Sequence, residues 1–541
     1  MTGLRTRAKI LAGRLPWAPE LYQDLFARQR PPATGFALGR LEGSLPTWVE
    51  AVEKARLAAD RRVGRRVLVV GYLTWWLEFC VALGLLLASQ GHAVDLGYLP
   101  YRRWTSPVDP FDVRRQRAYL QRVLQAARPL RPVDLSRPSS DLIPSDFADR
   151  LDHLSLTDVE YTLQRESPHF DQDLQARELF ALRQSRNTIA AGNALRLLRG
   201  EAYDAVVIPN GSILEFAAVY QAARFLGVPT VTYEFGEQRE RVWVCRDGEA
   251  MRLNTDDLWK ARGEASLTPA ERQEIETLVG ARKGGEEWQQ FRRRWQPAQR
   301  QGASSVRADL GLDDVRPIVL LTTNVVGDSL ALNRQIFTGG MADWLSQTLG
   351  YLAKRADIQT VVRVHPGELL GAGLPSEQIV RQTLPVVPPH VTLVPPESRV
   401  NTYDLIDSAH LGLVYTSTAG LEMAMHGVPV LTAGQTHYRN KGFTDDPDTL
   451  QDYFRLLEVR LAEPVGRSLH QDRIDLAWRY AHRFFFEFPF RFPWHLLHFW
   501  KDMEARPLEK LVADRCPGPY VEVLGVMAGE PVDWEQHARI R

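Results

Sequence analysis

Residues 359–368 read QTVVRVHPGE and residues 401–434 read NTYDLIDSAHLGLVYTSTAGLEMAMHGVPVLTAG, and together they decide the fold. They contain three short apolar runs, at 360–364, 411–416 and 429–433, each followed by small, polar or ring residues. Buried parallel strands have this pattern, and α/β proteins place ligands at the carboxyl ends of such strands. We therefore predict one side of a nucleotide-binding cleft here.

The rest of the chain repeats this alternation of strands and helices. In the N-terminal half, runs at 67–73, 93–99, 204–208 and 228–233 predict strands, with helical patterns between them. A further run at 317–323 opens a second series of strands. We therefore predict an α/β protein with two doubly wound Rossmann-like domains facing a cleft, followed by a C-terminal helical segment.

The composition is that of an ordinary globular protein. Lys and Arg total 66, as do Asp and Glu, so the net charge gives no reason to expect nucleic-acid binding. Cys80, Cys245 and Cys516 lie far apart without metal or redox spacing, which fits a reducing compartment. The N-terminus does not read as a signal peptide, and no apolar run reaches the roughly 18 residues of a membrane span. We expect a cytoplasmic protein.

His365 and Pro366 follow the strand predicted at 360–364. The proline biases His365 to an extended backbone, and the ring can then donate a hydrogen bond to a phosphate oxygen. The alternative is a histidine that only caps the next segment. Arg363 lies on the same strand face as His365 and is either a second cation of the site or, as we favour, a structural partner for a carboxylate.

Ser417 and Thr418 open a predicted helix directly after a strand. Free backbone N–H groups at a helix N-terminus, with hydroxyls beside them, form an anion site without a metal. Simple N-capping is the alternative, and the two roles can coexist. Glu422 lies in the first turn of this helix, where it either favours the helix dipole or accepts hydrogen bonds from ribose hydroxyls.

The N-terminal half offers candidates for the other side of a cleft. Glu234 and Glu237 follow the strand at 228–233, and a carboxylate there can act as a general base on an acceptor hydroxyl. The alternative is a charged loop. Asn210 and Gly211 end the preceding strand and either shape the acceptor side or cap the next helix.

The sequence lacks the familiar motifs for metals and cofactors. It has no GxxxxGK[ST] phosphate loop, no GxGxxG fingerprint, no HExxH and no paired CxxC. DxD-like strings occur only in charged stretches away from strand ends. We therefore expect neither a required metal nor a cofactor.

Three strings carry a family resemblance: VVRVHPGE at 361–368, the segment at 401–434 and HYRNKGF at 437–443. They closely resemble the bacterial capsule polysaccharide biosynthesis proteins, which include the Kdo transferases of capsule assembly. The close resemblance covers residues 316–450, and DAVVIPNG and PTVTYEFG in the N-terminal half are weaker matches. It implies the GT-B glycosyltransferase architecture, with a nucleotide sugar as co-substrate and a glycan or glycolipid as acceptor.

The resemblance also implies roles for individual residues. In such enzymes an HP motif contacts the donor nucleotide, and a Ser/Thr pair after a later strand binds its phosphate. On the donor side these roles fall to His365, Pro366, Ser417 and Thr418, with Glu422 near the ribose and His437 and Tyr438 in the loop after the last strand. Glu234 or Glu237 becomes the carboxylate that activates the acceptor.

The predicted boundaries follow from these assignments. They are 1–66 for a basic N-terminal segment, 67–260 for an acceptor domain with an insertion at 101–175, 261–315 for a charged helical linker, 316–450 for a nucleotide-sugar domain and 451–541 for C-terminal helices and a tail.

Two segments concern further partners. Residues 1–66 carry more basic than acidic side chains, and residues 484–500 carry nine aromatic ones. One interpretation is peripheral contact of these segments with the inner membrane or with capsule assembly proteins. The alternative, which we favour for the aromatic residues, is packing onto the N-terminal domain.

The sequence favours a metal-independent glycosyltransferase of surface polysaccharide synthesis. A nucleotide-sugar 2-epimerase, which shares the architecture, is the enzymatic alternative. A non-catalytic protein that binds glycan or scaffolds capsule assembly is the other alternative.

Overall fold

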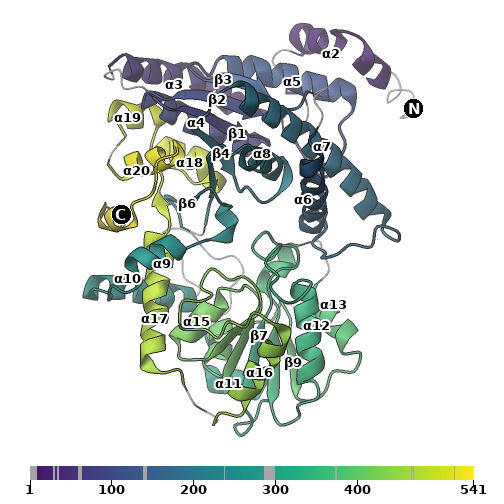
Figure 1. Ribbon diagram of the computed structural model, residues 1–541, viewed down its shortest axis with the longest axis vertical. Helices are drawn as coiled ribbons and strands as arrows, with labels where there is room; N and C mark the ends of the chain where they lie inside the picture. Colours follow the sequence, from purple (N-terminus) through teal and green to yellow (C-terminus); the bar gives the residue numbers. More distant parts are fainter. Residues whose placement is uncertain are drawn as a thin grey trace.

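The computed structural model describes residues 9–540 apart from 28–30, 33–35, 59–63, 138–142, 237, 285–298, 372–374, 465, 467 and 517. In this part of the chain the strands form two sheets, which occupy the upper and lower halves of Figure 1. The upper sheet has seven strands in the order β12-β6-β5-β4-β1-β2-β3, and the lower has five in the order β11-β10-β7-β8-β9. The prediction of two Rossmann-like units is confirmed.

The core of the upper sheet consists of short runs of β-branched and aliphatic residues. Its parallel strands are β1 (Arg66–Gly71), β2 (Ala93–Tyr98), β3 (Arg131–Asp134), β4 (Ala205–Pro209) and β5 (Thr230–Glu234). Val67 pairs with Val94 on one side and with Ala205 on the other, so β1 is an interior strand of the sheet. Buried on both faces, these strands show the continuous apolar pattern of a parallel sheet.

Helices cover both faces of this sheet (Figure 1). They are α3 (Gly39–Ala58), α4 (Thr74–Ser89), α5 (Pro110–Gln125), α6 (Ser145–Leu163), α7 (Leu174–Gly200) and α8 (Leu214–Phe225). Helix α4 is apolar on all sides and almost wholly buried because it packs between the sheet and outer elements such as α3 and α19 (Leu508–Ala513).

The segment predicted as an insertion at 101–175 contributes to this sheet. It holds α5, α6 and the edge strand β3, whose Val133 pairs with Gly97 of β2. The sequence did not predict β3, because this strand has only four residues, RPVD, and is partly exposed.

The other edge of the sheet is antiparallel. Strand β6 (Arg241–Arg246) pairs with β5, and β12 (Phe490–Arg491) pairs with β6. The aromatic segment at 484–500 leads through this edge, and Phe490, Phe492 and Trp494 are at most 1% exposed. These side chains belong to the core of the upper domain, as the favoured interpretation predicted, whereas Phe484, Phe486 and Phe488 pack in a cluster with residues of the lower domain.

The lower sheet is wholly parallel. Its strands are β7 (Ile318–Thr322), β8 (Gln359–Arg363), β9 (Val391–Val394), β10 (Leu411–Val414) and β11 (Val430–Thr432). The chain builds from β7 through β8 to β9 on one side and then returns to add β10 and β11 on the other. The order therefore reverses between β7 and β10, and such switch points hold the ligands of open α/β sheets.

Further helices surround the lower sheet and join it to the upper one. They are α9 (Asp256–Arg262), α10 (Pro269–Gly284), α11 (Ala303–Asp309), α12 (Met341–Leu352), α13 (Ser376–Thr383), α14 (Thr402–Ile406), α15 (Ala419–Met425), α16 (Leu450–Leu461) and α17 (Gln471–His482). The chain then returns to the upper domain, where α18 (Phe499–Ala505), α19 and α20 (Gly518–Met527) pack, and ends with α21 (Trp534–Ile540).

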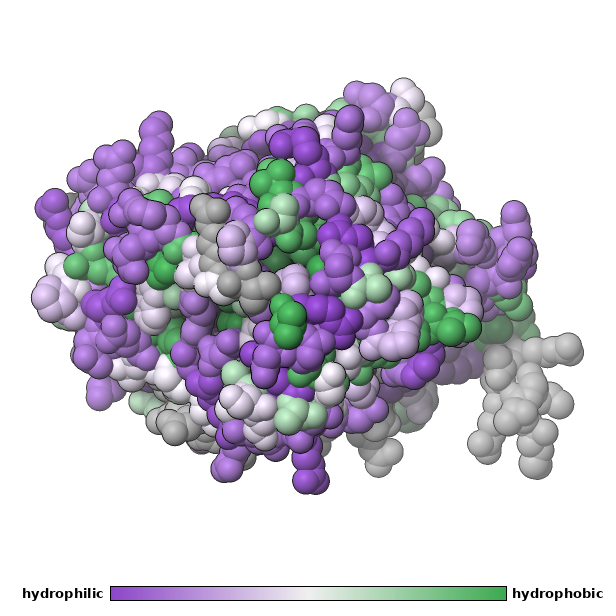
Figure 2. Space-filling view, turned by 90° about the horizontal axis from the view of Figure 1, so that it is seen from below, coloured by the Kyte–Doolittle hydropathy of each residue, from purple (hydrophilic) through white to green (hydrophobic). Residues whose placement is uncertain are grey.

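Seen from below, the molecule is largely hydrophilic, with hydrophobic residues in small separate groups (Figure 2). Within the described residues, no helix combines the length and apolar character needed to cross a bilayer.

Candidate functional site

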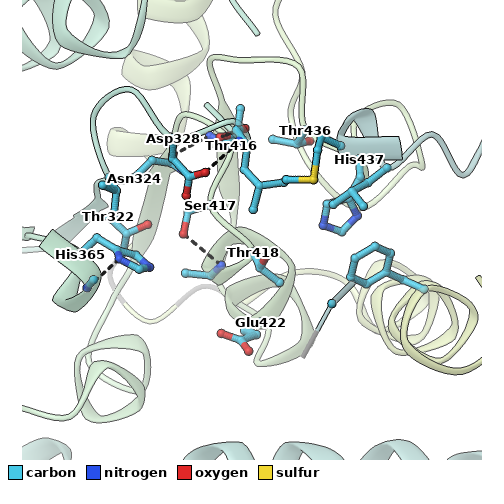
Figure 3. Close-up of a pocket in the computed structure, with 18 of the residues that line it drawn as sticks. Thr322, Asn324, Asp328, His365, Thr416, Ser417, Thr418, Glu422, Thr436 and His437 are labelled. Atoms are coloured by element: carbon cyan, nitrogen blue, oxygen red, sulfur yellow. Dashed lines mark hydrogen bonds between the residues drawn. The ribbon is translucent and has the colours of Figure 1, made fainter. Parts of the chain in front are cut away.

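A cavity of about 1290 Å³ lies between the two sheets. Its lower wall comes from the loops after β7, β8 and β10, and Figure 3 shows His365, Thr416, Ser417 and Thr418 around it. Its upper wall includes residues around β5 and β6, namely Phe235, Gly236, Gln238, Arg241, Trp243, Met251, Arg252 and Leu253, and residues from the segment around β12, namely Phe484, Phe485, Pro489, Leu497 and His498. The cavity thus lies at the switch point of the lower sheet, where a ligand is expected.

Hydrogen bonds fasten the loops of the lower wall to one another. The Asn324 side chain, after β7, accepts from the backbone N–H of Thr416, after β10, at 3.1 Å. The backbone N–H of His365, after β8, donates to Thr323 Oγ1 at 3.0 Å. Three separate strand ends therefore present their side chains as one wall (Figure 3).

His365 is oriented by its own turn. Its Nδ1 accepts a hydrogen bond from the backbone N–H of Gly367 at 3.0 Å, and Pro366 begins the 3₁₀-helix η3 (Pro366–Leu370). Because Nδ1 is an acceptor, the proton of the neutral ring lies on Nε2, which makes Nε2 a donor. The predicted capping role of His365 is therefore present, and His365 and Pro366 both line the cavity.

Ser417 and Thr418 line the cavity immediately before α15. Ser417 Oγ accepts from the backbone N–H of Ala419 at 3.3 Å, and the backbone carbonyl of Ser417 accepts from the Tyr438 hydroxyl at 2.6 Å. Tyr438 is fully buried. It lies in the predicted loop after β11, but it supports the Ser417 turn and does not line the cavity.

Glu422 also lines the cavity, and one of its oxygens is strongly bound. Oε1 accepts from Arg282 Nε at 2.8 Å and from the Tyr403 hydroxyl at 2.8 Å. The carboxylate is thereby held in one orientation beside the Ser417 turn (Figure 3).

Two buried arginines give the lower wall its positive charge. Arg363 is 4% and Arg334 is 3% exposed, and both line the cavity. Their short bonds go to neutral oxygens: Arg363 Nη1 donates to the Pro395 carbonyl at 2.6 Å, and Arg334 Nη2 to the Met251 carbonyl at 2.5 Å. Burial lowers the pKa of each to about 10, and Arg252 adds to the effect at Arg334.

Neither guanidinium forms an ion pair with a described residue. The Glu397 carboxylate acts on Arg363 only from beyond ion-pair distance, so the expectation that Arg363 is a structural partner for a carboxylate stays a prediction. Buried cations are normally paired, so two that lack a carboxylate within ion-pair distance among the described residues and face one cavity favour an anionic ligand.

His437 faces the same cavity from the loop after β11. Its ring stacks on Phe484 with centroids 3.9 Å apart, and Nδ1 lies 2.9 Å from the Tyr480 hydroxyl. Burial lowers the pKa of His437 to about 3, so the ring is neutral. Its Nε2, together with Thr322 Oγ1 and Thr436 Oγ1, is buried without a hydrogen-bond partner among the described residues. Such orphaned atoms in a cavity wall suit a polar ligand.

Glu234 lies beside Asn210 at the end of β5, and neither residue is among those that line the cavity. Asn210 Nδ2 donates to Glu234 Oε2 at 2.9 Å, and the next residues, Phe235 and Gly236, line the cavity. Burial raises the pKa of Glu234, against the lowering effect of this hydrogen bond. Glu237, the other predicted carboxylate, lies outside the described residues.

The turn that holds Asn210 requires its glycine. Gly211 has φ +84°, and a Cβ there would lie 2.6 Å from Thr232 Cγ2. Behind the turn, Arg183 bonds to Asp158 at 3.0 Å and Glu215 at 2.7 Å, all three fully buried, and Asp158 accepts from the Leu214 N–H. This ionic cluster fixes the start of α8 and thereby the Asn210 turn.

One group of described residues has metal-ligand types within reach of one another: Glu271, His482 and Glu487. Arg483 Nη1 already bonds to both carboxylates, at 3.1 Å to Glu271 and by a shorter contact to Glu487. A guanidinium therefore supplies the positive charge that a metal would bring. The trio lies on α10, α17 and the turn after α17, away from the cavity wall.

Sequence reasoning missed the loop after β7, including Asn324, Asp328 and Arg334. Its residues, TNVVGDSLALNR, contain no motif. Only the position of this loop pointed to a role. It follows β7, and the strand order of the sheet reverses between β7 and β10.

Residues 283–461 match the sequence profile of the family described as capsule polysaccharide biosynthesis protein. The match holds β7 to β11 and the lower wall of the cavity, and it confirms the resemblance seen in the sequence. No curated protein matches the chain.

Several solved structures are similar in arrangement at low identity. Two are described as KpsC from Thermosulfurimonas dismutans: a beta Kdo 2,4 transferase (17% identity, 61% of this chain, 88% of that chain, TM-score 0.36) and a beta Kdo 2,7 transferase (13%, 53%, 79%, 0.30). Another is a UDP-GlcNAc 2-epimerase from Neisseria meningitidis (13%, 76%, 94%, 0.22). The family match over residues 283–461 and the geometry of the cavity are the basis for the function proposed below.

Proposed function

We propose that the protein is a glycosyltransferase that moves a sugar from a nucleotide-activated donor to a capsule-type polysaccharide or glycolipid acceptor. The observation that carries the proposal is the pair of buried arginines, Arg334 and Arg363, that face the cavity without a carboxylate partner among the described residues. The capsule biosynthesis profile over the same wall supports it.

The donor side follows from the chemistry of a departing nucleotide. As the bond between the sugar C1 and the phosphate oxygen breaks, negative charge grows on the phosphate. Arg334, Arg363 and the Nε2–H of His365 stabilise this charge, with Ser417 and Thr418 as hydroxyl donors. The second oxygen of Glu422 accepts from the ribose, since Oε1 is already bound.

The acceptor side belongs to the upper wall. The attacking hydroxyl loses its proton to Glu234, while the sugar C1 leaves the phosphate and bonds to the acceptor oxygen. Asn210 holds the carboxylate in place. Because the arginines supply the charge, the proposal includes no divalent metal, and chelation with EDTA should leave turnover unchanged.

Nucleotide binding tests the donor side. Isothermal titration with UDP, CMP, GDP and dTDP should give binding with at least one of them. Arg334→Met and Arg363→Met should each weaken it by roughly ten- to a hundredfold, since a hydrogen bond to a charged group is worth about 1.5–3 kcal/mol. Arg381 is an exposed arginine of α13, so Arg381→Met is the matched control and should bind normally. Failure of all four nucleotides to bind would refute the proposal.

Product analysis separates the remaining alternatives. A 2-epimerase would convert its nucleotide sugar without an acceptor, whereas the proposed transferase consumes the donor only when a glycan acceptor is added. A non-catalytic scaffold would keep its cellular role after His365→Ala or Ser417→Ala. Loss of polysaccharide in both variants, with normal protein levels, supports the transferase.

A further inference from the structure

The turn between α6 and α7 reaches from the upper domain to the lower one. Glu166, in this turn, extends to the start of α12. Its Oε1 accepts a hydrogen bond from the backbone N–H of Met341 at 3.1 Å, and its Oε2 accepts one from the backbone N–H of Ala342 at 2.8 Å. One side chain of the upper domain thus holds the first turn of a helix in the lower domain.

The start of α12 is well suited to this carboxylate. The first amides of an α-helix have no partner within the helix, and the helix dipole favours a negative charge beside them. Glu166 is half-buried, and burial raises its pKa against the lowering effect of the two hydrogen bonds. Gly340 leaves room for it, because a Cβ at that position would lie 2.5 Å from Glu166 Oε2.

Two further glycines of the lower domain fit closely against the same part of the upper domain. A Cβ at Gly327 would lie 2.6 Å from the Glu160 carbonyl oxygen, and a Cβ at Gly371 would meet the side-chain oxygen of Gln164. Gly327 belongs to the loop after β7, and Gly371 follows η3 in the loop after β8. The α6–α7 turn therefore packs against two of the loops that supply the lower wall of the cavity.

A chain of three contacts leads from Glu166 to the cavity wall. Met341, whose N–H donates to Glu166, is fully buried, and its sulfur accepts the backbone N–H of Asn324 at 3.3 Å. The Asn324 side chain accepts from the backbone N–H of Thr416, and Ser417 follows. The position of Glu166 is thereby connected to the turn that presents Ser417.

The contact lies where no polypeptide connection joins the two domains. In Figure 1, α6 and α12 are at the right of the molecule. Helices α9 and α17, which belong to the two connections between the sheets, are at the left. Glu166 therefore links the domains on the side opposite to their connections.

We propose that Glu166 is a positioning residue that holds α12 from the upper domain and thereby keeps the Asn324 and Thr416 loops in their ligand-binding arrangement. Separation of the domains would withdraw the carboxylate, so the lower wall would have this arrangement only while the cleft is closed. The part of the proposal that concerns nucleotide binding rests on the proposed function, whereas the contact between the domains does not.

Hydrogen exchange of the full chain tests the contact and its reach. In Glu166→Ala, and in Gly340→Ala, which fills the place of the carboxylate, residues 339–343 and 415–418 should both exchange about tenfold faster than in the wild type, because hydrogen bonds to a charged group are lost. A purely local role would accelerate exchange at 339–343 alone. Unchanged exchange in β1 shows that the variants are folded.

Isothermal titration measures the effect on ligand binding. The ligand is whichever of UDP, CMP, GDP and dTDP binds the wild type, and both variants should bind it about tenfold more weakly. Glu166→Gln keeps one oxygen that can accept an amide, so its loss should be smaller than that of Glu166→Ala. If none of the four binds the wild type, the proposed function fails, and the exchange experiment alone decides this inference.

Matched controls lie nearby in the chain. Glu178 is an exposed carboxylate of α7, and Gly339 precedes Gly340 at a position where an added Cβ would meet Asp343 only at an ordinary distance of 3.5 Å. Glu178→Ala and Gly339→Ala should match the wild type in both measurements. Wild-type exchange at 415–418 in Glu166→Ala and Gly340→Ala would overturn the proposal, as would wild-type nucleotide affinity in both.

Discussion

Glu234 is the residue on which the proposed chemistry places its proton transfer. Only the carboxylate form accepts a proton, and burial raises the pKa of this group. As the pH is lowered, kcat/KM should therefore begin to decrease at a higher pH than it would with an ordinary glutamate, because the group is protonated at its raised pKa. Asn210→Ala removes a bond that favours the carboxylate, so this decrease should move to still higher pH.

Glu234→Gln is the companion variant. It should lower turnover by about 10²–10⁴-fold while nucleotide binding stays unchanged. A pH profile that does not move in Asn210→Ala, or full activity in Glu234→Gln, would remove Glu234 from the mechanism and direct attention to Glu237.

Gly420 and Tyr438 form a second residue-scale test. A Cβ at Gly420 would lie 2.2 Å from the Tyr438 hydroxyl, so Gly420→Ala should cost about 1–3 kcal/mol of unfolding free energy. Tyr438→Phe loses one hydrogen bond, worth about 1 kcal/mol, but it also removes the obstructing oxygen. In urea unfolding the double variant should lose less than the sum of the two.

The control for this pair is Gly350→Ala in α12, where an added Cβ meets nothing within 4 Å. Removing a helical glycine there should stabilise by about 0.5–1 kcal/mol. Strict additivity of the Gly420 and Tyr438 changes would show that the two side chains do not compete for space.

At the scale of elements, α4 buries an acid inside an apolar helix. Glu78 is 9% exposed and accepts from Trp500 Nε1 at 3.0 Å, and burial raises its pKa to about 7. A raised folded-state pKa means that stability is full below the unfolded value near 4.5 and is lost as pH rises toward 7. Glu78→Gln should therefore stabilise the protein at pH 8, on the order of 3 kcal/mol, and change little at pH 4. Denaturant titration at both pH values measures the difference.

Elements also show what the sequence could predict. The parallel strands were visible because buried runs such as those of β7 and β10 are continuously apolar. Strands β6 and β12 were not. In β6 buried and half-exposed residues alternate, and β12 has two residues whose partner lies about 250 positions earlier. Pairing between such distant segments is a property of the folded chain.

Likewise, the sequence predicted some residues of the candidate site and missed others. His365, Ser417, Thr418 and Glu422 were predicted from strand ends, since the end of a strand fixes where the next residue points. Arg334 was not, because an arginine in a loop is normally exposed and only tertiary packing buries it.

At the scale of the molecule, the C-terminal segment contributes part of the core of the upper domain. Trp494 is fully buried there, and its Nε1 donates to the Arg506 carbonyl at 2.9 Å. Trp494→Ala should cost about 3–5 kcal/mol and expose backbone amides of β5 and β6 to hydrogen exchange, far from the change in sequence. Trp75→Ala, at a position 47% exposed, is the control and should leave exchange unchanged. Faster exchange in β8 or β9 instead would show that the segment stabilises the other domain.

The return of the chain to β12 has a mechanical consequence. The polypeptide passes between the two sheets twice, once between β6 and β7 and again between β11 and β12. A body tethered at one point can swivel in any direction, but a body tethered at two points turns most easily about the line that joins them. The two walls of the cavity are thus restricted to something near a single path of approach. His365, on the lower wall, and Glu234, the residue before the upper-wall residue Phe235, would then meet in the same alignment on every turnover.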